Sequence, residues 1–135
     1  MSAAQKACKS ASGPGASALV NRRILLVEDE AFIAMELEDM LLDAGAEVVG
    51  PVANLQAALK AAEDEPIDAA ILDIMLGQEE VFPAASVLQG RAVPFVFHSA
   101  HAEADALQAH YPGAALYSKP VDTQVLLNGL AKLFD

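Results

Sequence analysis

The sequence predicts an α/β fold, an open and doubly wound sheet of five parallel strands with five helices. Short apolar runs of the kind found in strands buried on both faces recur along the chain. Helical segments separate these runs, and such alternation is typical of right-handed crossovers and a parallel sheet. The chain has 135 residues, too few for an eight-stranded α/β barrel, which favours the open sheet.

Five strands are expected, at 24–27, 47–50, 69–72, 93–98 and 115–118. The first is the continuous apolar run Ile-Leu-Leu-Val, and the third is Ala-Ala-Ile-Leu. Pro94 has no backbone N–H to donate, so it fits only among the first positions of its strand.

Five helices are expected, at 31–44, 54–62, 82–88, 103–110 and 122–134. Apolar residues at helical spacing indicate the first helix, and Gly45 is a signal for its C-terminal end. Asn54 and Asp122 are expected to cap two of the helices, because their side-chain oxygens accept hydrogen bonds from the first backbone N–H groups.

Residues 1–20 are rich in Ala, Ser, Gly and Pro, so they are expected to form a flexible N-terminal tail, with one domain at 21–135. The single cysteine, Cys8, cannot form an internal disulfide, which makes the cytoplasm the expected compartment. No secretory signal is seen, and no apolar run approaches the roughly 18 residues of a membrane-spanning helix. We therefore expect no membrane insertion.

The charge is distributed unevenly around a formal net charge of −11. Residues 1–23 contain four basic residues and no acidic one, whereas from Ile24 onward four basic residues oppose all 19 acidic ones. Because the segment from Ile24 onward is so acidic, it should repel the phosphate backbone of a nucleic acid, and direct DNA binding is not expected.

Polar residues follow four of the predicted strands, at the edge of an open parallel sheet where ligands bind. They are Glu28, Asp29 and Glu30 after the first, Asp73 after the third, His98 and Ser99 at the end of the fourth, and Lys119 after the fifth. Clustered carboxylates raise one another's pKa unless a cation lies among them. Mg²⁺ suits this set, because it prefers oxygen ligands and uses one or two carboxylates with phosphate oxygens.

With Mg²⁺ present, an aspartate can act as a nucleophile toward a phosphoryl group and form an acyl phosphate. The oxygens of the transferred group need cationic and hydrogen-bonding partners, which Lys119 and Ser99 supply.

Each residue also has an ordinary structural interpretation: Asp29 as a helix cap, Asp73 as a turn residue and Lys119 as a surface lysine. Their joint occurrence at strand ends favours the functional interpretation. His98 is expected simply to fill a strand end, while His101 lies where it could tune the access of water.

These residues resemble the receiver domain of two-component response regulators, the CheY-like family, over essentially all of 24–135. The matching motifs are Glu28-Asp29, Asp73, Ser99-Ala100 and Lys119-Pro120, in that order at successive strand ends. The resemblance implies a flavodoxin/CheY-like sheet with strand order 2-1-3-4-5. It also implies that Asp73 is the phospho-acceptor and that Ser99 and Lys119 contact the phosphoryl group. Asp29 and Asp73 would bind Mg²⁺ directly, Glu28 through water, and Met75 through its backbone carbonyl. The Lys119-Pro120 bond is often cis in this family.

A stand-alone, single-domain subgroup of receivers is similar in the segments 76–83 and 94–97 and carries a Phe-Ala-Thr-Gly-type signature at the end of strand four. Here that signature reads Phe97-His98-Ser99-Ala100. Leu116 occupies the place of an aromatic residue that rotates inward in many receivers. Tyr117 points to the opposite face of its strand, so the usual aromatic switch is expected to be missing.

The resemblance implies a stand-alone response regulator that accepts a phosphoryl group from a histidine kinase or a histidine phosphotransfer protein in a Mg²⁺-dependent reaction. Its output would pass through protein contacts of the fourth helix, fifth strand and fifth helix, with a homodimer as one option. It would not be an enzyme beyond slow loss of its own phosphoryl group. Two alternatives stay open: a degenerate receiver used only for docking or dimerisation, and a Mg²⁺-dependent phosphatase, which the missing Asp-x-Asp motif disfavours.

Overall fold

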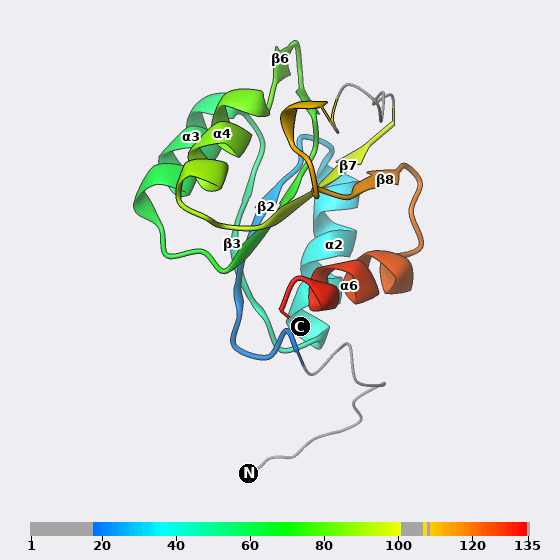
Figure 1. Ribbon diagram of the computed structural model, residues 1–135. Coiled ribbons are helices and arrows are strands. Elements are labelled where there is room, and N and C mark those ends of the chain that lie inside the picture. Colours follow the sequence, from blue (N-terminus) through cyan, green and yellow to red (C-terminus); the bar gives the residue numbers. More distant parts are fainter. Residues whose placement is uncertain (1–17, 101–106, 108, 135) are drawn as a thin grey trace.

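The structure, a computed structural model, describes residues 18–100, 107 and 109–134. Its main sheet has the order β3-β2-β4-β7-β8, and every neighbouring pair is parallel (Figure 1). The strands are β2 (Arg23–Val27), β3 (Glu47–Val52), β4 (Ala69–Leu72), β7 (Phe95–Ser99) and β8 (Leu116–Ser118). In chain order this is 2-1-3-4-5, so the predicted fold class and strand order are confirmed.

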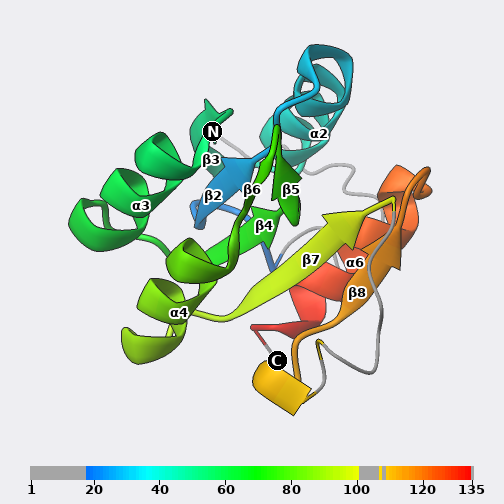
Figure 2. The ribbon, with the colours of Figure 1, turned by 90° about the horizontal axis from the view of Figure 1, so that it is seen from above.

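Helices cover both faces of the sheet. The described helices are α2 (Ala31–Asp43), α3 (Leu55–Asp64), α4 (Phe82–Gly90) and α6 (Thr123–Lys132). Helices α3 and α4 lie on one face, and α2 and α6 lie on the other (Figures 1 and 2). The helix predicted at 103–110 falls mostly outside the described residues. No helix in the described part of the chain is long and apolar enough to cross a bilayer.

Two of the predicted helix caps are confirmed. Asn54 Oδ1 accepts a hydrogen bond from the Ala57 N–H at 2.8 Å, and Asp122 Oδ1 accepts one from the Gln124 N–H at 2.8 Å. The cap position of α2 is Glu30, whose side chain makes no capping bond. Asp29 therefore does not have the capping role that was its structural alternative.

Strand β7 begins two residues later than predicted, at Phe95, and extends to Ser99. Pro94 precedes it and still takes part in pairing through its carbonyl, which accepts a bond from the Ala70 N–H at 3.1 Å. Strand β3 runs two residues further than predicted and includes Pro51. It is an edge strand of the sheet, where a residue without an N–H is tolerated.

The core has two layers, one on each face of the sheet. Leu25, Leu72 and Phe97 belong to the layer under α3 and α4, whereas Leu26 and Ile71 belong to the layer under α2 and α6. All four residues of β4 are buried, which explains why its sequence is a continuous apolar run rather than an alternating one.

Phe95 and Phe97 are confirmed as core residues, with ring centroids 5.3 Å apart. Phe82 and Tyr111 complete this aromatic cluster, in which Phe82 contacts Phe97 at 6.0 Å and stacks on Tyr111 at 5.8 Å. The edge-on and offset arrangements of the rings are those that aromatic pairs prefer.

The segment before β2 already contributes to the core. Leu19, inside the range expected to be a flexible tail, is fully buried in the layer under α2 and α6. Arg22 stacks its guanidinium over the Phe134 ring at 4.3 Å. The folded part of the chain thus includes Leu19, while residues 1–17 lie outside the described part.

The sequence did not predict a small antiparallel hairpin, β5 (Met75–Leu76) and β6 (Glu79–Glu80). It projects beyond the carboxyl ends of the main strands (Figure 1). Gly77 forms its turn with a φ of +65°, a conformation that favours glycine. Two-residue strands are too short to show an alternating pattern, so periodicity could not reveal them.

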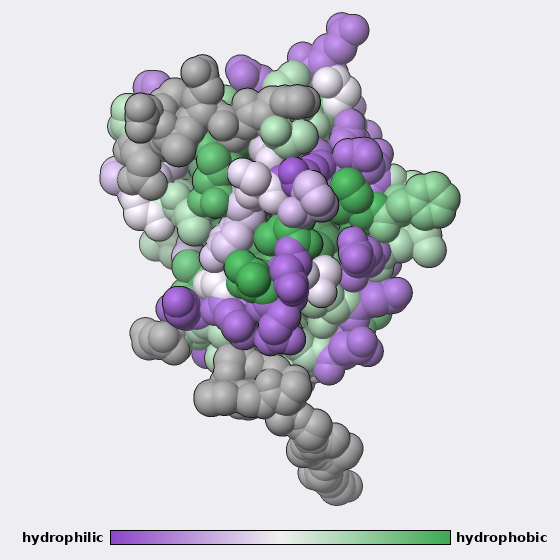
Figure 3. Space-filling model, turned by 90° about the vertical axis from the view of Figure 1, so that its right-hand side faces the viewer, coloured by the Kyte–Doolittle hydropathy of each residue, from purple (hydrophilic) through white to green (hydrophobic). Residues whose placement is uncertain are grey.

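The surface over α2 and α6 mixes hydrophilic and hydrophobic side chains (Figure 3). Phe32, Met35 and Leu42 on α2 and Val125 on α6 are exposed large hydrophobic residues. Phe32 is the most exposed of these four residues, at 87%.

Candidate functional site

Backbone hydrogen bonds extend the sheet past the ends of its strands. The Asp73 N–H donates to the Val27 carbonyl at 2.9 Å, and the Glu28 N–H donates to Val52 at 3.0 Å. The Lys119 N–H donates to the Ser99 carbonyl at 3.0 Å. The main chain therefore fixes the starting points of the Glu28, Asp73 and Lys119 side chains at the carboxyl edge of the sheet.

The strand register brings three polar residues into one row. Val27 is paired with Leu72, and Leu72 with Phe97, so Glu28, Asp73 and His98 each lie one residue further along three adjacent strands. Equivalent positions of parallel strands point to the same face. The exposed fractions of Glu28, Asp73 and His98 are 2%, 4% and 3%, respectively. Three ionisable side chains are thus buried side by side.

The Lys119 ammonium lies among the carboxylates of this row. Its Nζ donates to Glu28 Oε2 at 3.0 Å and to Asp73 Oδ2 at 3.1 Å, and it also reaches the exposed Glu30 at 3.4 Å. One ammonium therefore lies among three carboxyl groups, two of which are buried, so acidic groups outnumber basic ones at the site.

The pKa directions follow from this charge balance. Burial, together with the hydrogen bond and repulsion from Glu28, raises the pKa of Asp73 to about 7, although Lys119 acts in the lowering direction. Burial by itself lowers the pKa of Lys119, but its contacts with Glu28 and Asp73 outweigh burial, so this pKa is raised. The repulsion between carboxylates that the sequence led us to expect thus contributes to the raised pKa of Asp73, after burial.

Asp29 lies beside this row on the exposed side. Its Oδ2 accepts a hydrogen bond from the Gly77 N–H at 2.9 Å, which ties the loop after β2 to the β5–β6 hairpin. Glu28, Asp29 and Asp73 each offer one oxygen, and these atoms lie within 4.8 Å of one another. A cluster of carboxylate oxygens with excess negative charge fits a hard divalent cation such as Mg²⁺.

The remaining predicted site residues lie on adjoining elements. Ser99 is buried at the end of β7 and is paired with Ser118 of β8. Met75 begins β5, two residues after Asp73. The Lys119-Pro120 peptide bond is cis, as the family resemblance implies. The roles predicted for the Ser99 hydroxyl and the Met75 carbonyl stay predictions.

His98 lies much closer to the acidic residues than its expected role as a filler of a strand end implies. Its Nδ1 is 3.9 Å from Glu28 Oε1. Burial, followed by the nearby Lys119 ammonium, lowers the pKa of His98. The strand register was the signal that could have placed it beside Asp73. Of the other histidines, His101 lies outside the described residues and His110 is exposed.

Comparison with known proteins assigns these features to a family. Residues 24–131 match the response regulator receiver domain. PdtaR, a transcriptional regulatory protein of Mycobacterium tuberculosis, is 36% identical to this chain over 104 residues, which are 76% of this chain and 51% of PdtaR. The chain spans about half the length of the curated relatives it matches.

Two solved structures are similar over nearly their whole length. SdrG from Sphingomonas melonis Fr1 is 39% identical with a TM-score of 0.71, and the match covers 88% of this chain and 99% of SdrG. A response regulator receiver protein from Sinorhizobium medicae WSM419 is 26% identical with a TM-score of 0.77, covering 84% of this chain and 94% of that one. The acidic strand-end cluster thus lies in a sheet of the same architecture.

Proposed function

The chain belongs to the response regulator receiver domain family, the signalling domains of two-component systems, and we propose that Asp73 is its phospho-acceptor. The observation that carries this proposal is the burial of Asp73 against Glu28 and the Lys119 ammonium at the carboxyl end of the central strand β4. A buried carboxylate with a perturbed pKa and a cationic partner is typical of functional sites.

The proposed reaction is a phosphoryl transfer from a phosphohistidine. An Asp73 carboxylate oxygen attacks phosphorus, the bond between phosphorus and the imidazole nitrogen breaks, and that nitrogen leaves with the electron pair. The product is an acyl phosphate on Asp73. Lys119 Nζ contacts Asp73 Oδ2 at 3.1 Å, so its positive charge can stabilise the negative charge on the oxygens of the transferred phosphoryl group. The Ser99 hydroxyl would donate a hydrogen bond to the same group.

We propose that the acidic cluster holds Mg²⁺, with Asp29 and Asp73 as direct ligands, Glu28 through water and the Met75 carbonyl as a further ligand. When bound, the ion neutralises the carboxylates and the incoming phosphoryl oxygens. The spacing of the three carboxylates and the excess negative charge around Lys119 support this assignment.

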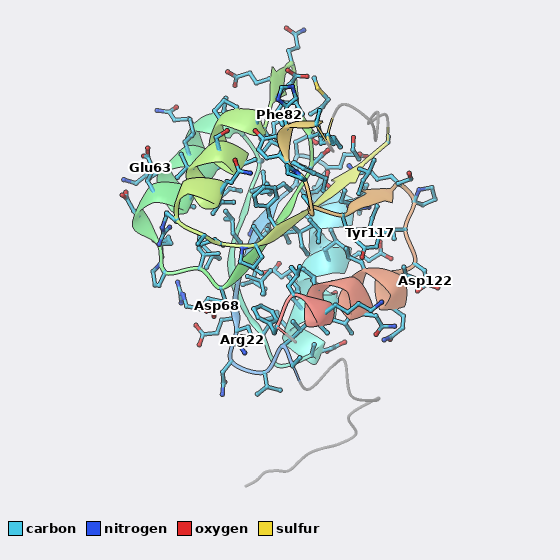
Figure 4. All side chains as sticks on the ribbon, viewed as in Figure 1. Arg22, Glu63, Asp68, Phe82, Tyr117 and Asp122 are labelled. Atoms are coloured by element: carbon cyan, nitrogen blue, oxygen red, sulfur yellow. The ribbon has the colours of Figure 1, made fainter. Side chains whose placement is uncertain are left out.

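The phosphodonor would be a histidine kinase or a histidine phosphotransfer protein, and output would pass through contacts of segment 103–110, β8 and α6. Tyr117 of β8 supports this choice, because its ring lies toward α6 and its hydroxyl fills the space beside Gly129 (Figure 4). A displacement of β8 would therefore act on α6 through the contact between Tyr117 and Gly129. The acidic charge argues against direct DNA binding, and the single cysteine is consistent with action in the cytoplasm.

The proposal is tested by incubating the protein with acetyl phosphate and Mg²⁺ and measuring its intact mass. We expect the addition of one phosphoryl group, labile to hydroxylamine and dependent on Mg²⁺, in the parent protein and in Asp68→Asn. Asp68 lies directly before β4, whose other end Asp73 follows, so it is a matched control. Asp73→Asn should show no adduct. No adduct in the parent protein, or an undiminished one in Asp73→Asn, would refute the proposal.

One observation favours a second candidate, a degenerate receiver that acts as a docking module without phosphorylation. Lys119 already donates to both buried carboxylates, so the fold has a cation at this site without Mg²⁺. This alternative predicts that Mg²⁺ leaves the melting temperature unchanged and that Asp73→Asn retains partner binding.

A further inference from the structure

His98 is a buried polar side chain whose two ring nitrogens have no hydrogen-bond partner among the described residues. It is 3% exposed and lies on β7 between Phe97 and Ser99. A buried polar group without a partner is destabilising, because it has lost its hydrogen bonds to water. A small apolar residue at this position would avoid that loss, so packing alone does not explain a histidine.

The two oxygens of the Glu28 carboxylate differ in their hydrogen bonding. Its Oε2 accepts hydrogen bonds from Lys119 Nζ at 3.0 Å and from the Glu30 N–H at 3.2 Å. Its Oε1 is buried and has no partner among the described residues. His98 Nδ1 lies 3.9 Å from this oxygen. Two buried atoms without partners among the described residues therefore lie 3.9 Å apart, and one is an acceptor while the other can carry a proton to donate.

We propose that His98 is a positioning residue for the metal site, which donates from Nδ1 to Glu28 Oε1 and so holds Glu28 with Oε2 toward Lys119 and the acidic cluster. A contraction of about 1 Å brings the two atoms from their present separation to hydrogen-bond distance, and such contacts are often longer before a ligand binds. Residues that orient a metal-binding carboxylate strongly affect metal affinity.

The inferred bond requires one particular tautomer of the neutral His98 imidazole. A neutral imidazole has one N–H, so a donor at Nδ1 leaves Nε2 unprotonated. With the proton on Nε2 instead, the Nδ1 lone pair would face the carboxylate oxygen and repel it. The tautomer of His98 is thus a direct readout of the inferred bond.

Substitutions of His98 can distinguish a role in positioning Glu28 from a role in filling space in the core. In Asn the amide nitrogen is as many bonds from Cα as Nδ1 is in His, whereas in Gln it lies one atom further, near the place of Nε2. His98→Asn can therefore reproduce the donor, while His98→Gln and His98→Ala cannot. His110→Ala, at an exposed histidine, serves as the control.

The experiment measures Mg²⁺ affinity by calorimetry and the melting temperature without Mg²⁺. We expect His98→Ala and His98→Gln to bind Mg²⁺ about tenfold more weakly, and His98→Asn and His110→Ala to bind as the parent protein does. A role in packing alone would change the melting temperature but not this order of affinities. Unchanged affinity in His98→Ala, or equal affinities of His98→Asn and His98→Gln, would overturn the inference.

The tautomer is measured on the unmodified protein by long-range ¹⁵N–¹H correlation of the imidazoles, so this arm does not depend on a variant folding. We expect the proton of His98 on Nδ1; a proton on Nε2 overturns the inference. The inference rests on the proposed Mg²⁺ site, and the arms distinguish the two failures. A parent protein that binds no Mg²⁺ refutes both, whereas Mg²⁺ binding that ignores His98 refutes only the role of His98.

Discussion

Two ionic clusters lie at opposite ends of the same sheet, and they differ in almost every physical respect. At the amino ends, Arg23 pairs with Glu47 at 2.9 Å and Glu65 at 3.2 Å, through side chains that are 33%, 60% and 47% exposed. At the carboxyl ends, Lys119 pairs with Glu28 at 3.0 Å and Asp73 at 3.1 Å, through side chains that are 10%, 1% and 5% exposed. Asp68 and Arg22, labelled in Figure 4, mark the amino end.

The difference separates a cluster with an ordinary structural role from the one that we propose as the phosphoryl-transfer site. Exposed ion pairs are screened by water and contribute up to about 1 kcal/mol each. Buried charges are expensive to desolvate, so their pairing is weak evidence for a gain in stability. Among the described residues, the buried side-chain atoms without partners are Glu28 Oε1 and the two His98 nitrogens, all at the carboxyl end. A fold selected for stability alone would not concentrate them there.

Removing the central cation should produce the largest effect on stability. Lys119→Met leaves Glu28 and Asp73 buried without their shared partner, and we expect a loss of about 3 kcal/mol of unfolding free energy in urea without Mg²⁺. Added Mg²⁺ should restore part of the loss. Lys60→Met removes an exposed pair with Asp64 and should cost less than about 0.5 kcal/mol. Equal losses in the two variants would contradict the distinction between the clusters.

Neutralising Asp73 should have a smaller effect of opposite sign. The folded protein holds the pKa of Asp73 at about 7 against 3.8 ordinarily, so between these values the folded state binds more protons than the unfolded state. The stabilising contribution of the Asp73 carboxyl group is therefore fully present below about pH 4 and is lost as the pH rises through about 7. We expect Asp73→Asn without Mg²⁺ to gain about 1 to 2 kcal/mol at pH 8.

Urea unfolding at pH 5 and pH 8 measures this effect. Asp73→Asn should also weaken the decline in stability between these two pH values. Asp68→Asn is the matched change at the other end, where the carboxylate accepts from the Arg23 N–H at 2.8 Å. We expect a loss there of about 1 kcal/mol. A stabilising Asp68→Asn or a destabilising Asp73→Asn would reverse the roles of the two ends.

The hairpin turn beside the site offers a change of about 1 kcal/mol. Gly77→Ala places a side chain at a φ of +65° and should destabilise the protein by about that amount through backbone strain. An added Cβ meets nothing within 4 Å at Gly77 or at Gly90. Gly90→Ala, in α4, should therefore be neutral or stabilising by up to about 1 kcal/mol. The melting temperatures of both variants measure the effect of backbone strain at Gly77 against a glycine without that strain, since neither site lacks space for a Cβ.

The smallest effect is expected at the amino end. Glu65→Gln removes the 3.2 Å contact with Arg23, in a cluster that keeps Glu47 as a partner. We expect a loss of about 0.5 kcal/mol, which should shrink further in high salt because exposed pairs are screened. Urea unfolding at low and high ionic strength measures it. A larger, salt-independent loss would show that this cluster behaves like the buried one.

The elements with strong local signals were predictable from the sequence. The apolar runs of β2 and β4 identified strands buried on both faces, and Asn54 and Asp122 marked the beginnings of two helices. The hairpin with Gly77 was missed because two-residue strands have no periodicity.

The site was predictable only in part. The positions of Glu28, Asp73 and Lys119 after strands indicated a cluster, because parallel strands bring their ends together. The proximity of His98 to Glu28 was not predicted, since it depends on the register of three strands. The burial of Leu19 was missed for a related reason: one apolar residue in a polar segment has no pattern of its own.

Mg²⁺ titration followed by residue-resolved ¹H–¹⁵N NMR tests the contrast between the two clusters most directly. We expect saturable shifts that fit one binding site at the amides of Glu28, Asp29, Asp73 and Met75, and no saturable shift at Arg23, Glu65 or Asp68. The absence of saturable shifts at the carboxyl end, or shifts of equal size and affinity at both ends, would contradict it.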